Sequence, residues 1–136
     1  MIKKSLLISQ PSYVHAGTRC EISFKFTPGE TIPKNTTFTF DFQMGELENK
    51  WVIHSLEASI LDQPNSKCDI SENKTECNQT KSINISLNQK LESSESLVIA
   101  LDATPQTNIE RKKEFNLTHI QSGKPFKEQF RINVYG

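Results

Sequence analysis

The sequence lacks the features that mark nucleic-acid-binding, membrane-spanning and disulfide-rich proteins. Its 136 residues carry 16 Lys and Arg against 16 Asp and Glu, so neither charge is in excess. Nucleic acids and anionic membranes select proteins with a positive excess, and no run reaches the roughly 18 apolar residues of a membrane span. Only three cysteines are present. We therefore expect one small domain with no nucleic-acid partner and no insertion of this segment into a membrane.

The sequence also lacks the motifs of common catalytic and metal sites. It holds no G-x-S-x-G, no glycine-rich phosphate loop and no H-E-x-x-H. Zinc is not expected, because there is no C-x-x-C pair and the three histidines are scattered. Asp69, Glu72 and Glu76 could supply oxygen ligands to calcium, but their spacing matches no calcium loop. We expect a protein that is not an enzyme and holds no metal or cofactor.

What the sequence does contain is a repeated alternation of apolar and polar residues. In residues 18–27 and 36–42 every second side chain is apolar, and phenylalanines occupy many of these positions. A period of two indicates half-buried β-strands, whereas no segment sustains the 3.6-residue period of a helix. Similar apolar faces recur in residues 51–60, 83–87, 97–101, 115–117 and 130–134.

Turn-forming residues separate these runs, as in Pro28-Gly29 and Thr104-Pro105. About seven to nine short strands without helices predict an all-β fold, an antiparallel immunoglobulin-like (Ig-like) β-sandwich. We expect a single domain over residues 1–136, as one unit of a longer tandem or assembled chain. Trp51 is expected in the core or at its rim. The basic run at residues 111–113 is expected to be a solvated edge, with an anion- or glycan-binding patch as the alternative.

The cysteines leave two pairings open. Cys68 and Cys77 lie nine residues apart in a polar stretch that we expect to be a loop, and the preferred hypothesis joins them in a disulfide. Cys20 then remains as a small buried apolar residue on a strand. The alternative hypothesis pairs Cys20 with one of the other two cysteines across the sandwich.

Five N-x-Ser/Thr triplets are the strongest indication of a compartment. Ten asparagines and 25 serines and threonines predict about two such triplets by chance. The strand parities place these asparagines on outward positions or in the polar loop, and a glycan requires such exposure. The triplets predict an N-glycosylated, extracellular or cell-surface protein, with glycans at Asn35, Asn73, Asn78, Asn84 and Asn116.

One part of the chain resembles a known kind of protein repeat. Residues 16–28 contain Ala16-Gly17 and an alternating strand, and residues 31–40 contain Ile32-Pro33 before a second one. This stretch resembles tandem β-sandwich repeats of long surface and filament proteins of protists and some microbes. Residues 130–136 look like the closing strand of such a repeat. The resemblance implies an extracellular structural or adhesive module, with no catalytic residues to carry over.

The preferred functional hypothesis is a structural unit that stacks end to end into an extracellular filament or stalk. Its partners are then copies of itself or neighbouring repeats, and N-linked glycans shield its surface. The terminal strands, residues 4–10 and 126–135, are candidate contacts, and one of them could add a strand to a neighbouring sheet. The alternative is a cell-surface adhesion or receptor module whose loops bind a protein or glycan.

Overall fold

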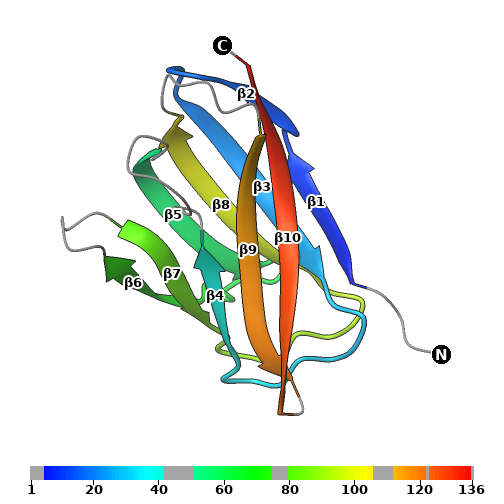
Figure 1. Ribbon diagram of the computed structural model, residues 1–136. Coiled ribbons are helices and arrows are strands. Elements are labelled where there is room, and N and C mark those ends of the chain that lie inside the picture. Colours follow the sequence, from blue (N-terminus) through cyan, green and yellow to red (C-terminus); the bar gives the residue numbers. More distant parts are fainter. Residues whose placement is uncertain (1–4, 42–50, 75–79, 106–111, 122, 136) are drawn as a thin grey trace.

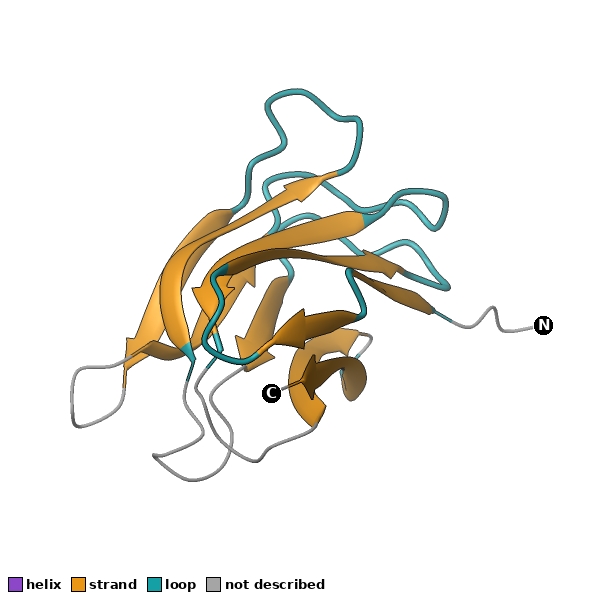
Figure 2. Cartoon of the chain, turned by 90° about the horizontal axis from the view of Figure 1, so that it is seen from above, coloured by secondary structure: helices purple, strands orange, loops and turns teal. Residues whose placement is uncertain are grey.

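The computed structural model of the chain is a sandwich of two β-sheets (Figure 1). It describes residues 5–41, 51–74, 80–105, 112–121 and 123–135. Every regular element in these ranges is a strand, as the view from above also shows (Figure 2). No described segment forms a helix that is long and apolar enough to span a membrane. The predicted all-β, Ig-like sandwich is therefore confirmed, with ten described strands in place of the expected seven to nine.

The two sheets divide the strands unequally. The four-stranded sheet is antiparallel and has the order β1 (Leu6–Gln10), β3 (Cys20–Thr27), β8 (Leu97–Thr104), β5 (Val52–Ile60). The six-stranded sheet has the order β2 (Tyr13–His15), β10 (Lys124–Tyr135), β9 (Lys112–Gln121), β4 (Thr37–Asp41), β7 (Thr80–Ser86), β6 (Asp69–Lys74). Only the short β2–β10 pairing is parallel among the pairings described.

Phenylalanines from both sheets form the centre of the core. The ring of Phe24 on β3 lies 5.1 Å from Phe40, 4.7 Å from Phe115 and 5.1 Å from Phe130, all on the opposite sheet. These four side chains are buried, as the alternating pattern predicts, and Trp51 is buried beside Phe115. Burial of each such side chain stabilises the fold by about 1.5–3 kcal/mol. The buried side chains at the alternating apolar positions therefore hold the two sheets together.

Two local expectations are wrong. The polar stretch that includes Cys68 was expected to be a loop, but Asp69–Lys74 forms β6 and pairs with β7. Its backbone bonds to a neighbouring strand are what make it a strand, since its own sequence shows no apolar alternation. Lys113 was expected on a solvated edge, but only 2% of it is exposed, because it continues the inward positions of Phe115. Lys112 is exposed, and Arg111 lies outside the described residues.

The chain enters and leaves the sandwich at opposite ends. β1 begins with Leu6, which pairs with Thr27 at the end of β3, and this end of β1 lies in the lower half of Figure 1. β10 finishes with Tyr135 at the upper end, where its carbonyl accepts a hydrogen bond of 2.7 Å from the Ala16 N–H. β1 is an edge strand, whereas the last three residues of β10 pair with β2, and the first of them, Asn133, also pairs with Lys112 of β9.

Candidate functional site

The outer face of the six-stranded sheet carries mostly amide and hydroxyl side chains, with Asp41 and Lys127 among them, and is here called the amide face. Strand register aligns two rows across five strands of this sheet. One row contains Gln129, Asn116, Asp41, Ser82 and Asn73. The next row contains Lys127, Thr118, Thr39, Asn84 and Ser71.

Hydrogen bonds join these side chains across the strands. Asn73 Nδ2 donates to Ser82 Oγ at 3.0 Å and to Asn84 Oδ1 at 3.3 Å. Asn84 Oδ1 also accepts a bond of 3.0 Å from the Thr39 hydroxyl. Glycosylation replaces one hydrogen of the asparagine amide nitrogen, so a glycan on Asn73 would remove one of its two bonds. Asn84 takes part in these bonds through its oxygen, which a glycan on its nitrogen would leave in place.

Asn116 lies on the outward side of β9, as the strand parity predicts, but the expectation that it is exposed is wrong. Only 4% of Asn116 is accessible to solvent. Gln129 and Asp41 flank it on the neighbouring strands, and Gln129 Nε2 donates to its Oδ1 at 3.1 Å. A glycan on Asn116 would therefore have to displace these neighbours in the folded protein.

The other predicted glycosylation sites differ in what the structure shows. Asn35 is exposed, as expected, at a turn where its φ angle is 72°. Asparagine tolerates this left-handed conformation better than most residues do. Asn78 lies outside the described residues. Glycosylation itself stays a prediction at all five asparagines.

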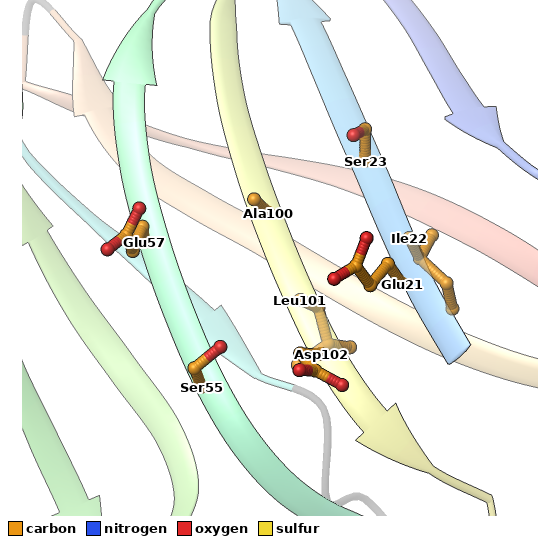
Figure 3. Close-up of a pocket in the computed structure, with 8 residues that line it drawn as sticks. All are labelled: Glu21, Ile22, Ser23, Ser55, Glu57, Ala100, Leu101 and Asp102. Atoms are coloured by element: carbon orange, nitrogen blue, oxygen red, sulfur yellow. The ribbon is translucent and has the colours of Figure 1, made fainter. Parts of the chain in front are cut away.

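The outer face of the four-stranded sheet carries a shallow acidic hollow of about 290 Å³ (Figure 3). One row across it contains Glu21, Asp102 and Ser55, and the next contains Ser23, Ala100 and Glu57. The small side chain of Ala100 leaves a depression between the longer side chains of the neighbouring strands. We call this surface the acidic hollow.

Arg19 fixes the charge of one carboxylate in the acidic hollow. Its Nε and Nη2 donate to the two oxygens of Asp102 at 3.0 and 2.8 Å. These hydrogen bonds, together with the charge of Arg19, lower the pKa of Asp102 from its ordinary value. Within the described residues, no group of three or more His, Cys, Asp or Glu side chains is arranged to hold a metal ion. Glu21 and Glu57 remain exposed at the two sides of the hollow.

The two described cysteines, Cys20 and Cys68, are free thiols. Cys68 is buried, and loss of solvent raises the pKa of its thiol to about 11. The Cys20 thiol donates to the Ala103 carbonyl at 3.4 Å, and burial raises its pKa as well. The structure supports neither a Cys68–Cys77 nor a Cys20–Cys68 bridge. Cys77 lies outside the described residues, so its pairing stays a prediction.

Most of the exposed large apolar side chains lie towards the ends of the sandwich, and several belong to the terminal segments, residues 4–10 and 126–135, that were expected to make contacts. At the upper end, the rings of Tyr13, His15 and Tyr135 form a cluster, here called the upper patch, with centroids 5.9–6.2 Å apart. Towards the lower end, Ile120 and Phe126 are exposed on the β9–β10 hairpin, and we call them the hairpin tip. Leu6 and Leu61 are also exposed near this end, Val52 near the upper end, and Ile8 in the middle of β1.

One feature of the sequence could have indicated an exposed aromatic residue in the upper patch. Tyr135 stands next to the buried Val134, so an aromatic residue occupies an outward position at the end of β10. The two tyrosines meet only because β2 pairs with β10, and no local pattern of the sequence shows this pairing.

Comparisons with known proteins establish the fold and no family. No family model matches the chain, and no curated protein matches it. Among solved structures, a cohesin module from a family 33 glycoside hydrolase of Clostridium perfringens is 12% identical, with a TM-score of 0.58 over 98% of this chain and 97% of that one. The N-terminal domain of the Streptococcus gordonii adhesin Sgo0707 is 11% identical, with a TM-score of 0.56 over 96% of this chain and 32% of that one. The chain is thus similar in fold to bacterial β-sandwich domains, one of them from an adhesin.

Proposed function

We propose that the chain is a structural module of an extracellular or cell-surface protein that is joined in series with similar units. One observation carries this proposal: β1 begins towards one end of the sandwich, and β10 finishes at the other. Units connected through such ends extend along one axis, as a filament or stalk requires. The five N-x-Ser/Thr triplets support the compartment, and the fold of the S. gordonii adhesin domain is compatible with a surface module.

The strand pairings at the two ends suit a load-bearing role. Tension between the ends pulls β1 and β10 along their own directions, so it shears the ladders that hold them. β1 is held to β3 by five residue pairs, and β10 is held to β9 by ten and to β2 by three. Hydrogen bonds in an antiparallel ladder run across the strands. Shear therefore loads many bonds together, whereas unzipping would break them one pair after another.

Single-molecule force measurements test this proposal. Handles at residues 5 and 135 apply shear, and we expect a high unfolding force in this geometry. Handles at residues 112 and 135 are the matched control, because Lys112 and Asn133 are neighbours at one end of the β9–β10 ladder and separate by unzipping. The control should unfold at a clearly lower force. Equal forces in the two geometries would remove the case for a load-bearing unit.

A second function, ligand binding by an adhesion module, is favoured by the acidic hollow. Its exposed Glu21 and Glu57 can attract a basic segment of a partner protein. A lysine-rich peptide should bind in low salt, and Glu57→Gln together with Glu21→Gln should weaken this binding. Unchanged affinity in the double variant would exclude the hollow as the binding site. The sequence hypothesis assigned ligand binding to loops without naming their residues, and residues 42–50, 75–79 and 106–111 lie outside the described part of the chain.

A further inference from the structure

We propose that units of this chain dock head to tail, with the upper patch of one unit receiving the hairpin tip of the next. This inference rests on the proposed assembly in series and names the surfaces that make the contact. Exposed apolar clusters on soluble proteins mark interaction sites. Here the two clusters lie at different ends of the molecule, which are also the ends where the chain enters and leaves.

The upper patch is held in place before any partner arrives. Tyr13 and Tyr135 are each 52% exposed, and their rings lie 5.9 Å apart in an edge-on arrangement. The parallel β2–β10 pairing and the hydrogen bond from Ala16 to the Tyr135 carbonyl fix the two strands that carry them. Exposed aromatic side chains of this kind serve as anchors at protein interfaces, and fixing them in advance lowers the entropic cost of binding.

The hairpin tip is an apolar knob with rigid support. Ile120 is 67% exposed on one face of the hairpin, and Phe126 is 43% exposed on the other. The ring of Phe126 stacks on His119 at 5.4 Å, and His119 in turn lies 4.8 Å from the core residue Phe38. The knob is thus connected to the hydrophobic core. In Figure 1 the hairpin extends below the other strands, where a neighbouring unit can reach it.

The two surfaces differ, so a contact between them leaves each unit with one unused surface of each kind. Such a heterologous contact repeats along an open filament, whereas a two-fold contact would stop at a dimer. The occupant we assign to the upper patch is a second copy of this chain, because the patch lies where β10 finishes and the hairpin tip lies towards the end where β1 begins, so units joined in series bring the two surfaces together. A carbohydrate stacked on the same aromatic rings is the competing occupant, and binding measurements separate the two.

Sedimentation velocity of the chain at rising concentration tests the contact. A short tether between units supplies an effective concentration in the millimolar range, so we expect wild-type association by about 1 mM. Tyr135→Ser and Ile120→Asp should each weaken self-association at least about tenfold, as loss of an interface anchor does. Ile8→Asp is the matched control, since Ile8 is exposed in the middle of β1, away from both surfaces. It should leave association unchanged.

Mixing the two variants gives the decisive result. Tyr135→Ser keeps an intact hairpin tip and Ile120→Asp keeps an intact upper patch, so an equal mixture should form dimers and nothing longer. Circular dichroism confirms that each variant is folded. The inference is overturned if the wild type stays monomeric at about 1 mM, if the mixture forms no dimer, or if the control weakens association as much as the end variants do.

Two further results distinguish the docking contact from a sugar site and from the load-bearing role. If Tyr135→Ser abolishes binding to a panel of soluble oligosaccharides and leaves self-association unchanged, the upper patch is a sugar site and the docking inference fails. The unfolding force of one unit does not depend on contacts between units. A high shear force without self-association would therefore retain the proposed load-bearing module and reject only the docking contact.

Discussion

The two outer faces of the sandwich differ in how far their outward-pointing side chains are exposed to solvent. On the six-stranded sheet, Asn116 and Ser82 are buried although they point away from the core. On the four-stranded sheet, Ser23 and Ala100 occupy outward positions and are exposed. The direction of a side chain is set by strand parity, but its exposure is set by the neighbours on adjoining strands.

Chemistry explains why the neighbours cover one face and not the other. Amides and hydroxyls both donate and accept hydrogen bonds, so side chains on the amide face bond to one another across strands. Carboxylates only accept when they are ionised, and like charges repel. Glu21 and Glu57 lie on strands either side of β8, Glu57 Oε1 accepts a hydrogen bond of 3.4 Å from Lys67 Nζ, and a hollow remains over the small Ala100.

The largest contrast between the faces should appear in glycan occupancy. In material secreted from a eukaryotic host, we expect Asn35 to be modified and Asn116 to be unmodified, because a glycan on Asn116 would displace Gln129 and Asp41. Asn84 should be modified more fully than Asn73, whose amide nitrogen makes two bonds. Intact glycopeptide mass spectrometry measures each site. Full occupancy at Asn116 in folded, secreted protein would contradict the burial argument.

Removing a buried amide should destabilise the protein more than removing an exposed hydroxyl. Asn116→Ala leaves the Gln129 amide without one of its acceptors, and we expect a loss of about 1–3 kcal/mol in the free energy of unfolding. Ser23→Ala, at an exposed outward position of the other sheet, should change it by less than about 0.5 kcal/mol. Urea denaturation measures both. Similar small losses in the two variants would show that the amide face contributes little to stability.

A charge placed in the acidic hollow should stabilise the protein. Ala100 pairs directly with Glu57 on the next strand, so Ala100→Lys creates a cross-strand pair of opposite charge. Such pairs contribute roughly 0.2–1 kcal/mol, and salt screens them. Ala100→Gln is the matched control of similar length without charge. If the gain of the lysine variant over the glutamine variant persists in about 1 M NaCl, roughly tenfold above ordinary ionic strength, electrostatics is not its cause.

Much of the fold, but little of the surface, could be predicted from the sequence. The alternating phenylalanines of β3 and β4 identify both the strands and their inward faces. This alternation can be read from a few neighbouring residues, without knowing which strands pair. β6 could not be found in this way, since its pairing with β7 and not its composition makes it a strand. The burial of Asn116 likewise depends on which strands lie beside β9, whereas that of Lys113 follows from the inward parity that it shares with Phe115.

The sites follow the same division. The triplet at Asn35 could be placed in an exposed turn, because the prolines and glycine before it indicate a turn locally. The acidic hollow requires the register of three strands that are distant in sequence, β3, β8 and β5. The upper patch requires the parallel pairing of the second strand with the last. The residues of these two surfaces are far apart in the sequence, and only the strand pairings bring them together.

The smallest expected effect concerns acid stability at the rim of the acidic hollow. Arg19 lowers the pKa of Asp102 below its ordinary value of 3.8. A carboxyl group whose pKa is lowered by folding stabilises the protein above its unfolded pKa, and this contribution is lost as the pH falls through the folded value. Protonation of Asp102 should therefore lower the free energy of unfolding of the wild type below about pH 4. Arg19→Gln should show a flatter dependence in urea midpoints measured between about pH 2 and 6.

The double-mutant cycle with Asp102→Asn determines whether the ion pair itself causes this dependence. Once Arg19 is replaced, the substitution Asp102→Asn should alter the pH profile much less, because the carboxylate has lost the partner that lowers its pKa most. Both side chains border open solvent, so the interaction is also expected to weaken in high salt. If Asp102→Asn changes the profile equally with and without Arg19, the acid sensitivity of this face comes from repulsion among its carboxylates and not from the ion pair.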